Sequence, residues 1–207
     1  MKVDVYELFP TVVMAFNLGR DLTEPEETVF KRELLSMGHN AGNWTSYADQ
    51  VLSEPELETL GKEILNLAYI YFDKVFHTKN TPELYYVQSW LNATSKDEFH
   101  HAHCHANSFL SGCYYYSVEE DDRIRFHNLV EQNKMLYFVP KEEVPYNARS
   151  WWVPTKKNDV IIWRSDLHHD VPKIEKDRNF PRVSLAFNIF VRGDIGGDEL
   201  RTGLRIG

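Results

Sequence analysis

The chain has 207 residues, of which 43% are hydrophobic and 14% aromatic, and its formal charge at pH 7 is −8. This composition is typical of a globular domain, and no apolar run approaches the roughly 20 residues of a membrane-spanning helix. The negative charge disfavours a nucleic-acid-binding or anionic-membrane-binding surface, because both require concentrated positive charge. We therefore expect a single domain over residues 1–207, with no nucleic-acid or membrane partner.

The N-terminal residues lack the basic region and apolar core of a signal peptide, so the sequence predicts a cytoplasmic protein. Only two cysteines occur, Cys104 and Cys113. Because Cys104 stands between two histidines, a structural disulfide is disfavoured and a reducing compartment fits the sequence.

Residues 1–80 are expected to form N-terminal strand structure and supporting helices. The first apolar pattern is interrupted at Pro10, which predicts a short strand, a kink and a second strand over Thr11–Asn17. Helix-start residues and apolar spacings of three and four predict two helices with a loop between them. The helices are expected over Pro25–Met37 and Pro55–His77, and the loop over His39–Gln50.

Residues 82–192 contain short segments rich in Tyr, Val, Ile, Phe and Trp, separated by polar loops. This succession predicts a mainly β fold, either a sandwich or an open barrel, with the helices packed on one sheet. The expected strands are Leu84–Asn92, His103–His105, Phe109–Val118, Arg123–His127, Met135–Val139, Asp159–Trp163 and Arg182–Arg192. The tail, residues 193–207, is expected to be either weakly ordered or in contact with the core.

Four of the nine histidines lie within six positions, at His100, His101, His103 and His105. In an extended segment His103 and His105 share one face, and imidazole is the commonest metal ligand. The pair His101 and His103 has the same spacing and is the alternative. We prefer His103 with His105 and interpret the two earlier histidines as solvent-exposed or substrate-side.

A third ligand is expected from the adjacent His168 and His169. Neighbours in an extended segment point to opposite faces, so only one of the two can join a shared site. Strand alternation further on places a polar set on one face, namely Arg182, Ser184, Ala186 and Asn188. A guanidinium and a hydroxyl on an inner face would be costly if unpaired, and they suit a small carboxylate.

The motif order His103-x-His105, Ser-Gly-x-Tyr-Tyr at 111–115, His169-Asp-Val and Arg182-x-Ser184 resembles the iron(II)- and 2-oxoglutarate-dependent dioxygenases. Within that superfamily the chain is similar to the prolyl-hydroxylase-like group and its bacterial and phage relatives, over roughly residues 85–191. The resemblance implies a double-stranded β-helix, or jelly roll. It also implies iron(II) bound by His103, His105 and His169.

The same resemblance implies that the arginine and serine of the last motif bind the distal carboxylate of 2-oxoglutarate. Tyr115 is the preferred further contact to this carboxylate, ahead of Tyr114 and Tyr116. Asn92 is a candidate polar contact to the co-substrate or substrate, with structural capping as its alternative role.

One position departs from the family pattern, since a carboxylate usually stands where this chain has His105. A three-histidine site still binds iron(II) but is less anionic, and the expected consequence is weaker metal binding, altered redox behaviour or a preference for zinc.

The implied function is a hydroxylase that couples C–H hydroxylation to the oxidation of 2-oxoglutarate by O2, releasing succinate and CO2. A prolyl or other protein side chain is the expected substrate. Two alternatives remain at this stage: a cupin-like three-histidine metalloenzyme without 2-oxoglutarate, and a non-enzymatic jelly-roll ligand-binding module.

Overall fold

The computed structural model describes residues 2–4, 6, 8–136, 138–197 and 201–207, which form two β-sheets and a set of helices. The strands of the larger sheet are β1 (Val13–Asn17), β2 (Met37–His39), β3 (Trp44–Ser46), β4 (Glu83–Thr94), β6 (Leu110–Ser117), β9 (Asp159–Arg164) and β11 (Arg182–Ile195). Their order is β1-β9-β6-β11-β4-β3-β2, and β12 (Leu204–Ile206) pairs with the end of β11. The smaller sheet consists of β5 (His100–His103), β10 (His169–Val171), β7 (Arg123–His127) and β8 (Ser150–Pro154), in that order.

The helices are α1 (Glu24–Leu34), α2 (Glu58–Phe76) and the short α3 (Leu129–Gln132), with 3-10 turns at Val51–Ser53 and Pro55–Leu57. A capping box at Thr23 begins α1, as the backbone N–H of Thr23 donates to Glu26 Oε2 over 2.7 Å. The predicted extension of this helix to Met37 is wrong, because Met37 already pairs with Ser46 in the sheet. None of the described helices is long and apolar enough to cross a membrane.

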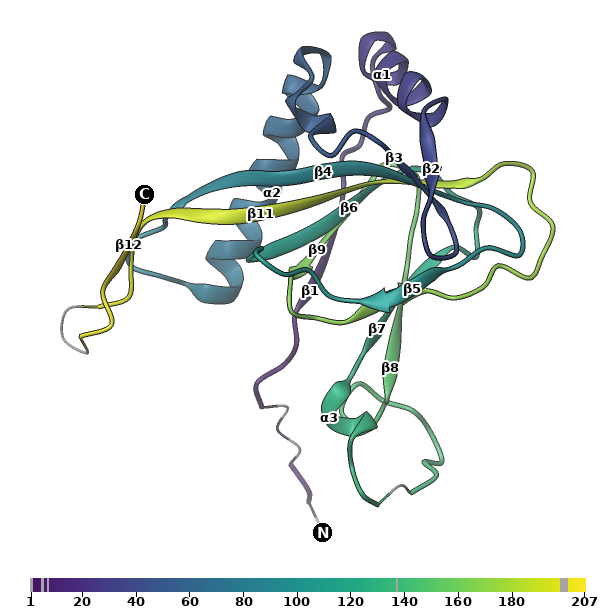
Figure 1. The fold of residues 1–207 in the computed structure, drawn as a ribbon. Coiled ribbons are helices and arrows are strands. Elements are labelled where there is room, and N and C mark those ends of the chain that lie inside the picture. Colours follow the sequence, from purple (N-terminus) through teal and green to yellow (C-terminus); the bar gives the residue numbers. More distant parts are fainter. Residues whose placement is uncertain (1, 5, 7, 137, 198–200) are drawn as a thin grey trace.

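The helices α1 and α2 cover one face of the larger sheet, and the smaller sheet lies on the other side (Figure 1). On the helix side, Leu185 and Phe187 of β11 share a core with the buried Phe30 and Leu60. This arrangement confirms the predicted alternation along β11, whose polar set therefore points toward the smaller sheet.

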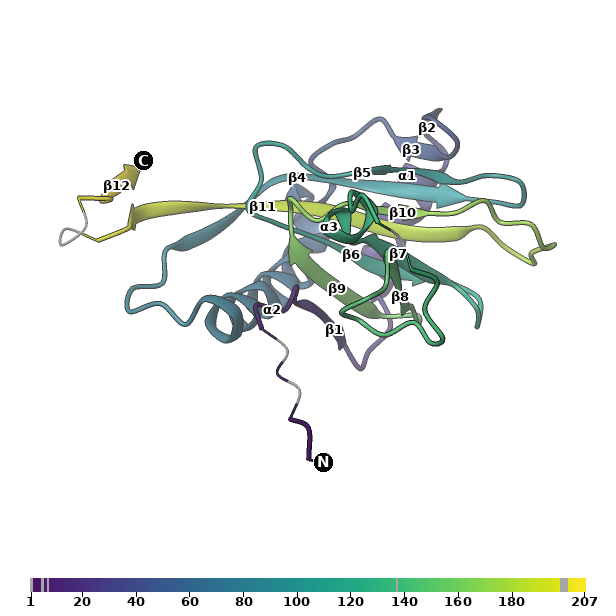
Figure 2. The same ribbon diagram turned by 90° about the horizontal axis from the view of Figure 1, so that it is seen from below.

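A second core cluster lies between the two sheets, which Figure 2 shows with the smaller sheet in front of the larger one. It joins Tyr115, Ile161 and Trp163 of the larger sheet to Ile124 and Phe126 of the smaller one. The face of β11 that points toward the smaller sheet thus lies next to this apolar cluster.

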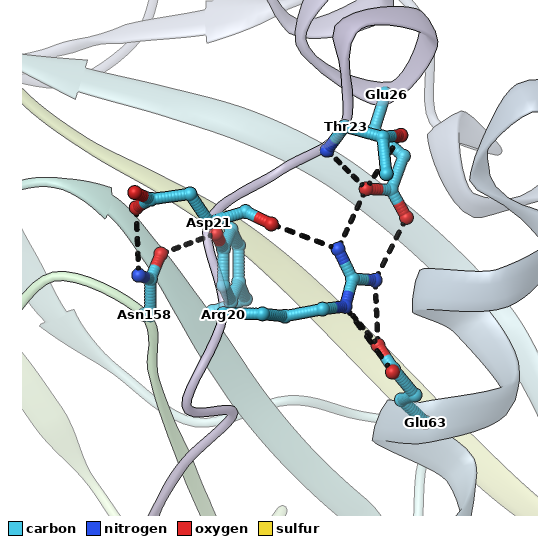
Figure 3. Close-up of polar contacts among 7 residues, drawn as sticks. Arg20, Asp21, Thr23, Glu26, Glu63 and Asn158 are labelled. Carbon is cyan, nitrogen blue, oxygen red and sulfur yellow. Dashed lines mark hydrogen bonds and ion pairs between the residues drawn. The ribbon is translucent and has the colours of Figure 1, made fainter.

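Arg20 fastens the connection between β1 and α1 to both long helices (Figure 3). Its two terminal nitrogens donate to the Glu26 carboxylate, each over 2.8 Å, and Nε donates to Glu63 Oε2 over 3.0 Å. The Glu26 side chain is only 2% exposed. Next to it, Asp21 accepts a 2.9 Å hydrogen bond from Asn158, in the turn before β9. One short segment therefore ties the helices to the larger sheet.

A long excursion, residues 128–149, connects β7 to β8. Its base is closed by the backbone N–H of Asn128, which donates to the Arg149 carbonyl over 3.0 Å. The predicted strand Met135–Val139 is wrong, since no strand occurs among the described residues of this excursion. Its apolar side chains are exposed and have no sheet to pair with, namely Met135, Leu136, Phe138 and Val139.

Two further expectations are resolved at the ends of the chain. Before Pro10, the described residues form no strand. In the tail, Gly193–Ile195, which end β11, pair with Leu204–Ile206, and the Ile206 side chain packs against the helix-side core. A third expectation lies away from the chain ends: the predicted loop His39–Gln50 is partly strand, because β3 lies within it.

Candidate metal and co-substrate site

Three predicted histidines converge on one point between the sheets. His103 ends β5 and His169 begins β10, and these two residues face each other in the antiparallel register. The candidate ligand atoms of His103, His105 and His169 all lie within 4.8 Å of one another. The neighbouring His168 does not join this group of described residues.

His105 reaches the group by a different route from the one predicted. The strand expected over His103–His105 is wrong, because β5 runs over His100–His103 and His105 lies in the segment after it. The backbone N–H of His105 donates to the Ser165 carbonyl over 2.9 Å. Backbone pairing with the β9–β10 connection, rather than strand alternation, therefore positions this imidazole.

Two of the three imidazoles have a defined tautomer. His103 Nδ1 lies 2.8 Å from the His101 carbonyl, and His169 Nδ1 lies 3.0 Å from the Leu167 carbonyl. A carbonyl oxygen only accepts, so each Nδ1 carries the proton and Nε2 keeps its lone pair. Such contacts are the ones that orient metal-binding histidines in proteins.

The third imidazole lies at ligand distance from this pair. The Nε2 atoms of His105 and His169 are 3.4 Å apart. Two nitrogens that are each about 2.1 Å from one ion lie roughly 3.0–3.4 Å apart at octahedral or tetrahedral angles. The observed separation therefore matches two ligands of a common ion.

Burial keeps the three imidazoles neutral. It lowers the pKa of His105 to about 4, with a further contribution from His103. Burial also lowers the pKa of His103 and moves that of His169 well below its ordinary value. The neutral imidazole is the metal-binding form. His103 and His169 present the lone pair on Nε2, and His105 does so when its own proton is on Nδ1.

A chain of buried polar groups reaches His105 from the larger sheet. Asn188 Nδ2 lies 3.4 Å from His105 Nδ1, and Ser111 Oγ lies 2.8 Å from Asn188 Oδ1. Ser111 Oγ is also 2.8 Å from Ser165 Oγ. Strand alternation indicates that Asn188 is on the site face, but it does not reveal this contact.

His100, interpreted above as solvent-exposed or substrate-side, is half-buried and lines the same pocket. The register between β5 and β10 shifts between the His103–His169 pair and the His100–Val171 pair. This irregularity brings the His100 ring onto His103, with centroids 4.6 Å apart. No periodic pattern in the sequence signals such a shift, whereas His101 is exposed as expected.

Arg182 is a buried cation without a carboxylate partner. It is 4% exposed, its Nε is buried without a hydrogen-bond partner, and none of the ion pairs among the described residues includes it. The Asp122 carboxylate, which acts on Arg182 from beyond ion-pair distance, is itself paired with Arg178. The guanidinium carbon of Arg182 lies 5.0 Å from the centre of the Tyr115 ring. A buried unpaired charge is costly, so this position fits an anionic ligand.

The strand register places three polar residues side by side near this guanidinium. Ser184 of β11 pairs with Asn92 of β4 on one side and with Tyr115 of β6 on the other. Asn92 and Ser184 are buried and line the pocket together with Arg182 and the three histidines. Asn92 Oδ1 also accepts a 3.4 Å hydrogen bond from Asn43, so a structural contact accompanies its place in the pocket.

The three adjacent tyrosines are separated by strand alternation. Tyr115 lies in the core between the sheets, and its buried hydroxyl has no hydrogen-bond partner. Tyr114 and Tyr116 pack on Phe30 of α1, on the opposite face of the sheet. Tyr115 is not among the described residues that line the pocket, and its link to the site is through Arg182.

Residues 88–188 match the family model described as "Putative 2OG-Fe(II) oxygenase". This region, 101 of the 207 residues, is that of the 2OG-Fe(II) oxygenase family. The matched region runs from β4 to β11 and so includes the whole pocket. Iron(II) and 2-oxoglutarate are the cofactor and co-substrate of this family. The residues fit both groups, because neutral imidazoles suit iron(II) and the unpaired Arg182 suits a carboxylate.

Solved structures of 2OG-dependent enzymes share the fold. HygX from Streptomyces hygroscopicus, solved with nickel, 2-oxoglutarate and hygromycin B, is 13% identical, with a TM-score of 0.56 and coverage of 95% of this chain and 92% of that one. The epimerase SnoN of nogalamycin biosynthesis is 16% identical, with a TM-score of 0.59 and coverage of 95% and 87%. A prolyl-4-hydroxylase from Pseudomonas putida is 10% identical, with a TM-score of 0.50 and coverage of 88% and 94%. No curated protein matches the chain. The predicted mainly β jelly roll with supporting helices is thereby confirmed.

Proposed function

We propose that this oxygenase hydroxylates a C–H bond, with iron bound by His103, His105 and His169. The observation that carries the proposal is the convergence of three neutral imidazoles in a pocket that also contains the unpaired guanidinium of Arg182. A metal-binding module without a co-substrate would have no use for that buried cation. The geometry therefore favours an enzyme with an anionic co-substrate over the two alternatives.

In this proposal Arg182 and Ser184 bind the distal carboxylate of 2-oxoglutarate. The planar guanidinium suits a bidentate contact, and the hydroxyl supplies another donor. Tyr115 supports the guanidinium through its ring, and Asn92 offers a polar contact on the neighbouring strand. These residues lie on β11, β6 and β4, which are paired in one sheet and so keep a fixed spacing.

When bound, iron(II) and 2-oxoglutarate supply the oxidation of a C–H bond by O2, with release of succinate and CO2. The part played by the chain is to orient the groups and keep water away. Two tryptophan rings next to the imidazoles help to keep water away from the site. Trp163 lies 4.7 Å from the His169 ring, and Trp90 lies 5.7 Å from the His105 ring.

As primary substrate we propose a protein side chain, with proline to be tested first. Support comes from the shared fold with the Pseudomonas putida prolyl-4-hydroxylase. A surface groove of about 580 Å³ also adjoins the pocket, because Val171 lines both. Trp152 and charges of both signs line this groove, which suits an extended peptide.

The first test measures binding of 2-oxoglutarate to the iron(II)-loaded protein under anaerobic conditions. The readout is the weak visible charge-transfer band of iron(II) with 2-oxoglutarate. We expect Arg182→Ala to raise the dissociation constant for 2-oxoglutarate roughly 30-fold or more, because loss of one partner of a buried charge pair costs about 2–5 kcal/mol. His169→Ala should abolish the band. Arg192→Ala is the matched control, since Arg192 is an exposed arginine on the same strand.

The outcomes separate the alternatives. Metal binding without any 2-oxoglutarate band would favour the cupin-like enzyme, and absence of metal binding would favour the ligand-binding module. For turnover, O2-dependent succinate formation should accompany a peptide product heavier by one oxygen atom. A product of unchanged mass, or one lacking two hydrogens, would contradict hydroxylation.

A further inference from the structure

We propose that His100, His101 and His103 form a second site for a transition-metal ion, which shares His103 with the iron site and so excludes iron while it is occupied. The candidate ligand atoms of these three histidines also lie within 4.8 Å of one another. The exclusion rests on the proposed function of His103, whereas the existence of the second site does not.

The irregular register of β5 creates this second cluster. In a regular strand, His100 and His103 would point to opposite faces. The shift against β10 brings both to one side, with ring centroids 4.6 Å apart. The His101 ring completes the group, at 5.4 Å from His100 and 4.9 Å from His103.

The second cluster faces solvent more than the first. His101 is exposed and His100 is half-buried, whereas His169 of the first cluster is buried. An ion arriving from solvent therefore meets the second cluster on its way to the pocket. Modest rotation of an exposed imidazole is also inexpensive, so His101 can adjust to the ion.

His103 can serve only one of the two clusters at a time. Its Nδ1 donates to the His101 carbonyl, which leaves a single lone pair on Nε2. One lone pair binds one ion. Occupancy of the second site therefore removes a ligand from the iron site, and tight binding of iron removes a ligand from the second site.

The donor set decides which ions fit. Neutral imidazoles suit Zn²⁺, Ni²⁺ and Cu²⁺, and tetrahedral zinc accepts three histidines and one water. Among the described residues no carboxylate joins the cluster, which disfavours Mg²⁺ and Ca²⁺ because these prefer oxygen ligands. Excess zinc is thus the ion expected to compete with iron through this site.

Zinc titration by calorimetry tests the proposal in a chain whose first site has been removed. The double variant His105→Ala/His169→Ala should still bind one Zn²⁺ per chain. Adding His101→Ala should weaken that binding by about tenfold or more, as loss of a ligand costs at least as much as loss of an outer-shell contact. Adding His39→Ala, which removes another exposed imidazole, should leave it unchanged.

Two results would overturn the second site: no zinc bound by the double variant, or binding that His101→Ala does not weaken. Circular dichroism verifies folding, and His169→Gln supplies the same readout if the double variant does not fold. In the unmodified chain, one Zn²⁺ per chain is expected, and two would contradict the sharing of His103. Failure of the 2-oxoglutarate test with a positive zinc result would refute the proposed function alone.

Discussion

His105 stands where the family resemblance leads us to expect a carboxylate, and its proposed role as a ligand depends on which ring nitrogen carries the proton. An imidazole binds a metal through one specific nitrogen, so the group against its other nitrogen decides whether the ring is in the binding tautomer. Asn188 lies against His105 Nδ1, and Ser111 holds the amide of Asn188. An amide nitrogen donates, so this contact places the lone pair of His105 on Nδ1. Binding of iron through Nε2 requires the Asn188 amide to turn over, so that its oxygen accepts from Nδ1–H.

With the amide turned in this way Asn188 is an outer-shell partner of the proposed ligand His105, so we expect Asn188→Ala to weaken iron(II) binding by about 10–100-fold. The dissociation constant for iron(II) measured anaerobically provides the check. Ser111→Ala should give a smaller effect in the same direction, because it acts through Asn188. If Asn188→Ala lowers the melting temperature of the metal-free chain and leaves iron affinity unchanged, Asn188 has only a structural role.

At the residue scale, strand alternation was sufficient to predict which side chains of β11 face the pocket. It separated Arg182 and Ser184 from the helix-side residues, whereas the preference for Tyr115 over Tyr114 and Tyr116 came from the family resemblance. It could not predict the place of His100, because a register shift breaks the period of two. The way in which His105 is positioned could not be predicted either, since it depends on a backbone hydrogen bond to Ser165, which is 60 residues away in the chain.

Among the elements, the connection from β1 to α1 shows how a buried carboxylate is stabilised. Glu26 is almost fully buried, and Arg20 donates to both of its oxygens. Arg20→Met should destabilise the fold by about 3–5 kcal/mol, because removing one partner of a buried pair leaves the other charge uncompensated. Urea unfolding measures this change. The double variant Arg20→Met/Glu26→Gln should recover part of the loss, and full additivity would contradict the coupling.

This ion pair also predicts a dependence of stability on pH. Burial raises the pKa of Glu26, but hydrogen bonds from Arg20 and Thr23 outweigh it and leave the pKa below its ordinary value. A carboxyl with a depressed pKa stabilises the fold fully above its unfolded pKa, about 4.3 for glutamate, and loses that contribution as pH falls through the folded pKa. Below pH 4 the free energies of unfolding of the unmodified chain and Glu26→Gln should therefore converge. A constant difference down to pH 2 would refute this origin.

Elements with local start and stop signals were the most predictable. Thr23 and Pro25 mark the start of α1, and Arg123–His127 was predicted with its observed bounds. The three-residue β10 was missed because it is too short to show a period, and its pairing with β5 and β7 is long-range. In the excursion between β7 and β8 a strand was predicted that does not form, because the β-favouring residues there have no partner strand to pair with.

For the molecule as a whole, the two core clusters share the larger sheet, which suggests that helices and sheets unfold together. Leu60 of α2 is fully buried, and it belongs to the same cluster as Leu185 and Phe187 of β11. We propose that the chain is one cooperative domain. Leu60→Ala should then lower the free energy of unfolding by about 2–5 kcal/mol, as large-to-small core changes do.

Two spectroscopic probes test whether this loss of stability affects the helices and the core between the sheets equally. Far-ultraviolet circular dichroism reports the helices, and tryptophan fluorescence reports the core between the sheets through the buried Trp163. Both midpoints should shift equally in Leu60→Ala. Separate midpoints, with the fluorescence transition unmoved, would show that the helices form an independent unit.

At this scale the sequence was most informative about architecture and least about pairing order. A helix pair followed by many short strands predicts a helix-covered β fold, and the motif spacing indicated the family. The order β1-β9-β6-β11-β4 brings together strands that are far apart in the chain. No local pattern encodes such contacts, so the meeting of His103 with His169 had to be inferred from the family resemblance.

The excursion between β7 and β8 has a consequence for how the surface of this fold can vary. Its two ends meet at the Asn128–Arg149 backbone bond, on a hairpin whose strands are paired along their whole length. Closing a longer or shorter loop across the same base changes the closure entropy only slightly, about 0.6 kcal/mol per doubling of length. The length and side chains of this segment can therefore change, by evolution or by grafting, while the pocket, which none of its described residues lines, stays intact.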